Sequence, residues 1–291
     1  MFLAVLFAAC GKEGDGPLGD GRIGIFTNPM AGGGTKVLVD PAAVNNASWV
    51  AGEQIDLNGT AYTIAGNSTD GFYLDGVAPL SEEMYAIYPA SVNDALGNDI
   101  AVTNGGDGAC AIDIHTLALN FRGDGKHDVI FPMAAHTAAG GTTLLFDHLT
   151  GGLKLTLTNA TSDDITVDSL VVTAENGSHA PAIYKDLRPA WAGSQLPGIP
   201  SGEVGAETGD QGAQFISDMT MMMNTNGTSG VTLAASSGIT FCIPMLAKDL
   251  RHLAVTGYHN GSQVFCKSKD LGAEKDIERN KMYTLPTINI D

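Results

Sequence analysis

The stretch FPMAAHTAAGGTTLLFDHLTGGLKLTLTN, from Phe131 to Asn159, is the part of the sequence that decides the fold. Within it, Leu153, Leu155 and Leu157 alternate with lysine and threonine. A period of two places the three leucines on one face and the polar residues in water, which is typical of a half-buried β-strand. The stretch therefore indicates a sheet protein.

The residues before this strand predict a domain boundary. A strand over 129–131 ends at Pro132, and a small-residue linker with Gly140 and Gly141 follows before the apolar run 144–146. One sheet system is expected to end before the linker and another to begin after it. The boundary is predicted between residues 139 and 140.

Composition supports two β domains. A chain of 291 residues exceeds the usual single core. Its 37 glycines and 16% charged residues, together with many Thr and Asn, disfavour long helices. The predicted fold class is all-β, with one β-sandwich over 23–139 and a second over 140–291. A balance of 15 Lys and Arg against 32 Asp and Glu, a net charge of −17, argues against nucleic acid as a partner.

Two Asn-Gly pairs predict hairpins. Asn58-Gly59 and Asn260-Gly261 each separate two apolar strands, and a type I′ turn needs positive φ at both central positions. The run 84–91 predicts a strand interrupted at Pro89, with Met84, Ala86 and Tyr88 on one face. Further strands are predicted over 37–39, 72–74, 111–114, 128–133, 165–174, 231–234, 238–246 and 282–290. Residues 185–230 are predicted to be irregular, and the methionines at 219 and 221–223 form either a contact surface or part of a core.

The N-terminus predicts export. Residues 1–9 are an apolar run too short to cross a bilayer core of about 30 Å. They are similar to the apolar region of a secretory signal, although no positive charge precedes them. Residues 6–10, LFAAC, resemble a lipobox, which would make residues 1–10 a lipoprotein signal and Cys10 the acylated residue; the alternative is an ordinary signal that contains a cysteine. Residues 11–22 are predicted to be a flexible tether.

The remaining cysteines leave two interpretations open. Cys242 and Cys266 lie in predicted strands of the second half and either pair across neighbouring strands or are buried hydrophobic residues. No CxxC or Cys/His ligand spacing predicts a zinc site.

No sequence motif indicates an enzymatic activity. HExxH, GxSxG, P-loop and GxGxxG patterns are absent, and no EF-hand spacing occurs. His148 is interpreted as a packing or hydrogen-bonding histidine, because no nucleophile is identified for it. No catalytic residue, metal site or cofactor is predicted.

Six stretches follow one another along nearly the whole chain: Leu6 to Cys10, Trp49…Glu53-Gln-Ile55, Tyr85-Ala-Ile-Tyr-Pro-Ala90, Phe131-Pro-Met133, Leu145-Phe-Asp-His148-Leu…Leu153 and Met282-Tyr-Thr-Leu…Ile288. Their order and spacing resemble the fimbrillin or Mfa-like family, the pilins and pilus-associated lipoproteins of type V pili in gut and oral anaerobes. The resemblance implies two transthyretin-like β-sandwich domains and export as an outer-membrane, surface-exposed lipoprotein or fimbrial subunit. It further implies non-enzymatic assembly with other pilin subunits by strand exchange, an outer-membrane lipid anchor, and host or bacterial surface ligands.

The same resemblance also implies a site of protease processing and a site of glycosylation. In polymerising members of the family an arginine-specific protease removes the first strand, and here Arg22 precedes Ile23-Gly-Ile-Phe26, which itself reads as that strand. Cleavage between Arg22 and Ile23 would leave the strand in place, which suits an anchor or accessory subunit; the alternative is that Arg22 is an ordinary solvated charge. Asp168-Ser169-Leu170 resembles a short O-glycosylation motif of such anaerobes, with Ser169 as the acceptor.

Two other functions remain as alternatives. A surface lipoprotein that binds glycans would need exposed aromatic rings, and Trp191 is the candidate because Trp49 reads as core. A secreted hydrolase would need converging acids or a nucleophile and histidine pair that no motif marks.

Overall fold

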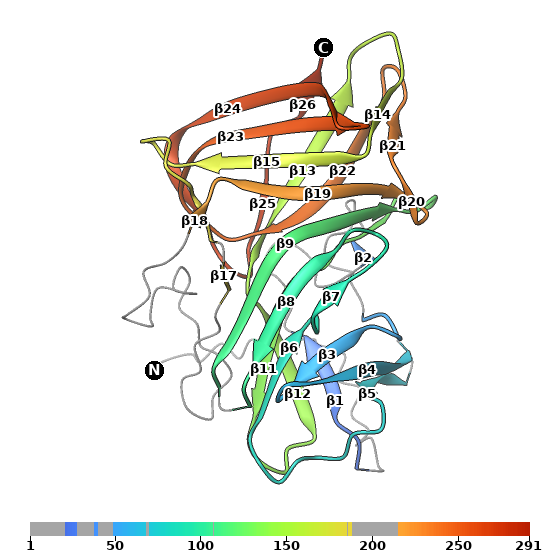
Figure 1. The fold of residues 1–291 in the computed structure, drawn as a ribbon, viewed down its shortest axis with the longest axis vertical. Coiled ribbons are helices and arrows are strands. Elements are labelled where there is room, and N and C mark those ends of the chain that lie inside the picture. Colours follow the sequence, from blue (N-terminus) through green and yellow to red (C-terminus); the bar gives the residue numbers. More distant parts are fainter. Residues whose placement is uncertain are drawn as a thin grey trace, which may run out of the picture.

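The computed structural model describes residues 21–27, 38–39, 49–67, 70–106, 108–184, 186–187 and 215–291. The regular elements in these ranges are all strands (Figure 1). The all-β prediction is confirmed for this part of the chain. The same residues contain no helix of the length and hydropathy needed to cross a bilayer.

A small closed barrel forms the lower part of the molecule in Figure 1. Among the described residues, the strand order around it is β1-β12-β11-β6-β3-β4-β5, and β5 pairs again with β1. Its strands are β1 (Gly24–Thr27), β3 (Gln54–Leu57), β4 (Thr60–Asn67), β5 (Gly71–Leu74), β6 (Met84–Tyr88), β11 (Met133–Thr137) and β12 (Thr143–His148). A separate apolar cluster that includes Trp49, Leu57 and Phe146 fills it.

Local sequence explains the barrel strands. Asn58 has φ of 49° and Gly59 has φ of 83°, so the predicted tight turn between β3 and β4 is confirmed. In β6 the side chains of Met84, Ala86 and Tyr88 are buried in the barrel, as the alternation predicts.

A large mixed sheet continues from the barrel into the upper part of the molecule. Its long strand β9 pairs antiparallel with β8 and parallel with β19, so residues from both halves of the chain share one sheet. In the described part of the chain its strands are β2 (Leu38–Val39), β7 (Val92–Asn93), β8 (Asp99–Asn104), β9 (Cys110–Phe121), β10 (His127–Asp128), β15 (Ser169–Glu175), β16 (Ile183–Tyr184), β17 (Asp186–Leu187), β18 (Phe215–Ile216), β19 (Asp218–Thr225), β20 (Thr228–Ser229), β23 (Ala247–His259) and β24 (Ser262–Ile277).

A second sheet faces part of this large sheet and completes a β-sandwich. It contains β13 (Gly151–Asn159), β22 (Gly238–Met245), β25 (Met282–Thr284) and β26 (Ile288–Ile290), and β14 (Ile165–Val167) pairs with β21 (Val231–Leu233) beside it. Leu153, Leu155 and Leu157 of β13 are fully buried in the common core, as predicted. The core also contains Ile112 and Leu119 from β9.

The change from barrel to sandwich lies later than the predicted boundary. Strand β12 pairs with β1 and β11, and therefore belongs to the barrel, whereas β13 belongs to the sandwich. The position between residues 139 and 140 thus lies inside the barrel, in the connection from β11 to β12. Conversely, β8 and β9 come from the region assigned to the first domain but contribute to the sandwich core. Small residues at 138–141 form a tight connection and not a domain linker.

Several predicted strands have different limits. The strand expected over 128–133 is wrong: β10 ends at Asp128, and β11 begins only after Pro132, which has no N–H to donate. The strand expected over 165–174 is divided at Asp168, and the last strand is divided into β25 and β26. The segment expected to be irregular contains β19, in which Met219, Met221 and Met223 alternate into the core. Three of the four methionines are therefore core residues, and Met222 is half-buried.

Candidate functional site

The strand β1 closes the barrel. It runs parallel to β12 and antiparallel to β5, and Ile25 lies opposite Leu144 on one side and Phe72 on the other. The side chains of Ile23 and Ile25 are buried in the barrel core, whereas that of Phe26 is 45% exposed. The strand expected over 23–26 is thus confirmed, and the observed strand, Gly24–Thr27, is shifted by one residue.

Hydrogen bonds hold both sides of this short strand. The N–H of Gly24 donates to the carbonyl of Thr142 at 2.8 Å, and the N–H of Leu74 donates to the carbonyl of Ile23 at 3.0 Å. Arg22 is exposed immediately before the strand, and its guanidinium carbon lies 4.5 Å from the centre of the Tyr73 ring. The chain therefore passes from an exposed arginine directly into a buried isoleucine.

The pairing of β1 with β5 and β12 determines which kind of strand could take its place in the barrel. Without β1, strands β5 and β12 would each present unpaired N–H and C=O groups, and the floor between them would be apolar. Such a groove is a template for a strand from another chain. The closing strand is therefore the candidate assembly site.

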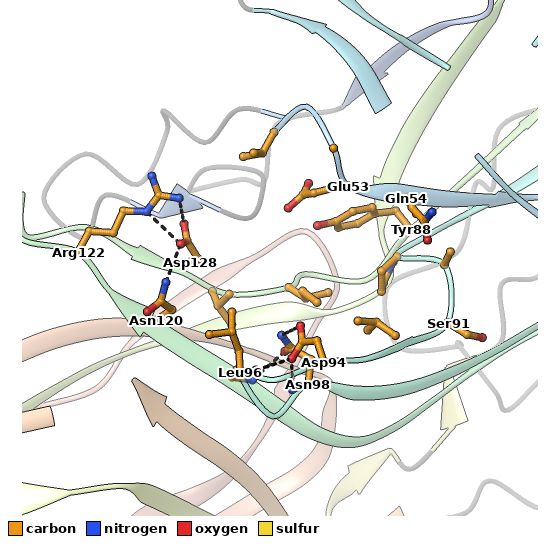
Figure 2. A pocket seen from close by; sticks show the side chains of 18 residues that line it. Glu53, Gln54, Tyr88, Ser91, Asp94, Leu96, Asn98, Asn120, Arg122 and Asp128 are labelled. Atoms are coloured by element: carbon orange, nitrogen blue, oxygen red, sulfur yellow. Dashed lines mark hydrogen bonds and ion pairs between the residues drawn. The ribbon is translucent and has the colours of Figure 1, made fainter. Parts of the chain in front are cut away.

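A pocket of about 410 Å³ lies where the barrel meets the large sheet (Figure 2). Glu53, Gln54 and Tyr88 come from the barrel side, and the opposite wall belongs to the large sheet and the loop before β8. The opposite wall includes Asp94, Leu96, Asn98, Asn120, Arg122 and Asp128.

Two carboxylates of this pocket, those of Asp128 and Asp94, are held by ion pairs and hydrogen bonds within its wall. Arg122 forms two contacts with Asp128, at 3.0 Å from Nε and 2.7 Å from the terminal nitrogen. Asn120 adds a hydrogen bond to the same carboxylate at 3.2 Å. The Asp94 carboxylate accepts from the backbone N–H of Leu96 and from both the backbone and side chain of Asn98. These carboxylates stabilise the wall of the pocket.

Two hydroxyl groups, those of Tyr88 and Ser91, also line the pocket. Burial raises the pKa of the Tyr88 phenol well above its usual range, and the nearby carboxylate of Glu53 raises it further, so the phenol stays protonated. The Ser91 hydroxyl accepts from the N–H of Val102 at 2.9 Å and donates to the carbonyl of the same residue at 3.3 Å. Among the residues that the structure describes, the lining contains neither histidine nor cysteine.

The other predicted site residues are dispersed. Cys10 and Trp191 lie outside the described residues, and Trp49 is buried in the barrel core. Ser169 begins β15, a strand paired with both β19 and β23, and its hydroxyl lies 3.5 Å from an oxygen of Asp168. Its side chain is half-buried.

The two cysteines of the suggested disulfide lie in different sheets. Cys242 is buried in β22, Cys266 is exposed in β24, and both are free thiols. Burial raises the pKa of Cys242 to about 11. Strands β22 and β24 pair with different partners, β13 and β23, so the two cysteines do not lie on neighbouring strands.

Two buried histidines have structural roles, His148 where the barrel meets the sandwich and His127 between the two sheets of the sandwich. His148 is fully buried and its ring meets Phe131 edge to face, with ring centres 5.9 Å apart. His127, which no sequence pattern singled out, accepts a hydrogen bond at Nε2 from the N–H of Cys242 at 3.0 Å. The two residues are 115 positions apart, so periodicity could not reveal this contact.

Comparison with known proteins gives distant likenesses. No family model matches the chain, and no curated protein matches it. A candidate cell adhesion protein from Bacteroides ovatus ATCC 8483 has a TM-score of 0.43 and 14% identity, over 92% of this chain and 91% of that chain. A fimbrial protein from the same organism has a TM-score of 0.28 and 11% identity, over 93% of this chain, which spans 50% of that chain. Both likenesses are too distant to assign a fold or a function.

Proposed function

We propose that the chain is a non-enzymatic, structural cell-surface protein of the type V pilus kind, either a fimbrial subunit or an accessory anchor lipoprotein. It assembles with other pilin subunits by donor-strand exchange and supports adhesion to host or bacterial surfaces. The proposal joins the resemblance of six sequence stretches to the fimbrillin or Mfa-like family with one structural observation. That observation is the closure of the barrel by β1.

The geometry of β1 supports strand exchange. The strand has only four residues and is paired on both sides; Ile25 within it and Ile23 just before it are the inward side chains that an incoming strand would have to replace. A replacement strand would run parallel to β12 and carry apolar residues two positions apart.

The position of Arg22 favours an anchor or accessory role. A protease that cut after this exposed arginine would leave β1 in the barrel, since the carbonyl of Ile23 is bound by Leu74. If Cys10 is acylated, the uncut tether holds the protein at the outer membrane. Measuring the mass of the mature N-terminus tests this part: an acylated Cys10 supports an anchor, an Ile23 start indicates processing, and an unlipidated start elsewhere contradicts the lipoprotein assignment.

Strand exchange is tested by cutting the folded chain at two positions. A specific protease site is inserted after Thr27 in one variant, which frees β1, and after Arg22 in the control, which leaves β1 attached. After cleavage, the first variant is expected to form oligomers in light scattering or to bind a labelled peptide of residues 21–27, and the control is expected to do neither.

A second peptide provides the specificity control. Replacing Ile23 and Ile25 of the peptide by aspartate places charges against the apolar floor and should abolish binding. Strand exchange is contradicted if the variant cut after Thr27 loses β1, keeps its far-UV spectrum, and neither assembles nor takes up the unmodified peptide.

A further inference from the structure

Strand β22 is an edge strand of the smaller sheet of the sandwich. Among the described residues it pairs only with β13, in antiparallel register. In such a pair, both the N–H and the C=O of every second residue point away from the partner strand. Cys242 belongs to this set, because its N–H donates to His127 at 3.0 Å and not to β13. Pro244, Thr240 and Gly238 follow the same alternation, so their backbone groups also point to the free edge.

The contacts around Thr240 agree with this assignment. Thr240 lies directly opposite Thr156, and their hydroxyl oxygens are 2.9 Å apart. Side chains approach each other more closely in the pairs that exchange no backbone hydrogen bonds. At the next position outside the strand, the carbonyl of Ser237 accepts from the N–H of Asn159 at 2.7 Å, so the other set of residues bonds toward β13.

Two of the four outward positions are protected from pairing with another chain. Pro244 has no N–H to donate. The N–H of Cys242 is already bonded to the buried ring of His127. At Thr240 and Gly238, by contrast, no described residue forms a hydrogen bond with the outward N–H or C=O. The open part of the edge therefore offers one donor and one acceptor at each of two positions, about 7 Å apart along the strand.

A groove of about 540 Å³ lies beside this open part of the edge. Phe121 at the end of β9 and Val231 of β21 form apolar parts of its wall, and Gly230 contributes no side chain. Among the described residues its lining contains no Asp or Glu, although the chain has 32 of them. The guanidinium of Arg122, which also lines the groove, is bound to Asp128. The groove is thus apolar and carries no free charge among these residues.

We propose that this groove binds an uncharged, extended segment of a partner protein, which adds to β22 as a further strand. An extended backbone repeats its N–H and C=O groups at the spacing of Gly238 and Thr240, so one segment satisfies both positions. The absence of free charge in the lining selects a segment without ionised side chains, because a charge there would be desolvated without a partner. The wall formed by Phe121 and Val231 favours apolar or β-branched side chains at alternate positions.

The inference does not rest on strand exchange at β1, because the groove belongs to the sandwich and is present while β1 closes the barrel. It is tested with the full, uncut chain. The probe is a capped, fluorescein-labelled hexapeptide of alternating threonine and valine, and fluorescence anisotropy measures its binding.

Two substitutions at one position separate the backbone from the side chain. T240P removes the outward N–H, and the strand already accepts a proline at the equivalent outward position, Pro244. T240V keeps that N–H and removes only the hydroxyl that contacts Thr156. We expect T240P to bind the peptide about tenfold more weakly than the wild type, since one hydrogen bond is lost and a peptide carbonyl stays unpaired. T240V should bind as the wild type does.

Hydrogen exchange of the wild type gives a second readout that does not depend on the folding of T240P. Added peptide should slow the exchange of the Thr240 amide and leave β5 and β12 of the barrel unchanged. The inference is overturned if the wild type does not bind the peptide, if T240P binds it as well as T240V does, or if the protection appears in the barrel and not at Thr240. Protection in the barrel alone would instead support strand exchange at β1.

Discussion

The barrel and the sandwich differ in their strand edges: the barrel has none, whereas the sandwich ends in an edge strand among the described residues. The barrel is closed by hydrogen bonds, but the closing strand β1 has only 4 residues. The sandwich leaves the 16-residue strand β24 paired on one side only, among the described residues. The barrel is therefore sensitive to the loss of one short strand, whereas the sandwich depends on protecting a long one.

The protection of β24 is visible in its side chains and its register. Lys267 and Lys269 line the gap between β24 and the segment 285–289, and Lys267 forms an ion pair with Asp291. The pairing of β23 with β24 also has register shifts, which bend the edge. Charges at an edge strand and bulges oppose pairing with another chain. For the strand exchange proposed above, this difference favours the barrel and disfavours β24 as the place of pairing.

The largest effect is expected from a charge on the closing strand. The substitution I25D places a carboxylate among the apolar side chains of the barrel core, between β5 and β12. We expect a loss of about 4 kcal/mol in the free energy of unfolding, or release of β1. Urea unfolding measures the loss, and hydrogen exchange in β5 and β12 reports the release.

The control for this prediction lies one residue further along the strand. F26D changes an outward side chain that is 45% exposed, and it should cost less than about 1 kcal/mol. Equal effects of I25D and F26D would contradict the view that β1 closes the barrel through its inward face.

A smaller effect is expected at the contact that joins the two units. Arg279 lies in the connection from β24 to β25, and its side chain is buried. It donates from Nε to the carbonyl of His148, at the end of β12. Burial lowers the pKa of Arg279 to about 10, and the charge of Asp147 opposes this shift. R279A leaves that carbonyl and Asp147 without the guanidinium, and we expect a loss of about 3 kcal/mol.

Chemical denaturation of R279A and R279K measures this contribution. Lysine keeps the charge but has no planar fork, so R279K should recover only part of the loss. If the barrel and the sandwich unfold in two separate steps in R279A but in one step in the wild type, the residue couples the two units. A wild-type free energy of unfolding in R279A would show that it does not.

The pH dependence of stability tests a contact inside the sandwich, that of His127 with Cys242. Burial lowers the pKa of His127 to about 4, while the backbone of Cys242 opposes the shift. An unfolded histidine takes up a proton near pH 6.5, so between pH 6.5 and 4 the unfolded chain binds more protons than the folded one. Stability should fall as the pH falls through this window, by about 2 kcal/mol at pH 5.

The variant H127Q isolates the histidine. Glutamine retains a hydrogen-bond acceptor for the N–H of Cys242 but does not titrate. The difference in unfolding free energy between pH 7 and pH 5 should shrink by about 2 kcal/mol relative to the wild type. An unchanged difference would assign the acid sensitivity to other groups.

The sequence predicts those elements whose cause is local. Alternation predicts the buried leucines of β13 and the two faces of β6, and Asn-Gly predicts both hairpins, because each signal depends on a few adjacent residues. The Met residues of β19 alternate in the same way, but the surrounding glycines and prolines suggest an irregular segment. Local composition there conflicts with the pairing of β19 to β9 and β15, and the pairing determines the structure.

The boundary and the sites could not be derived in the same way. The parallel pairing of β1 with β12 joins residues more than a hundred positions apart, and it determines that β12 belongs to the barrel. The contact of His127 with Cys242 and the groove beside β22 likewise depend on the packing of distant strands. Arg22 and β1 were predicted as neighbours in sequence, but only the fold shows that β1 closes a barrel.

The smallest expected effect is the difference in stability between variants of the two hairpin turns, one in each unit. Asn58 has φ of 49° and Asn260 has φ of 51°, so glycine fits both backbones without strain. Asn58 also donates to the carbonyl of Glu83 at 2.9 Å and accepts from the N–H of Tyr85 at 2.8 Å, which ties the turn to β6. Among the described residues, the side chain of Asn260 forms a hydrogen bond only with its neighbour His259. N58G should therefore cost about 1.5 kcal/mol, and N260G should be nearly neutral. Thermal unfolding of both variants measures the difference; if N260G costs as much as N58G, the side-chain contacts of Asn58 contribute nothing, and the two turns stabilise their units by backbone conformation alone.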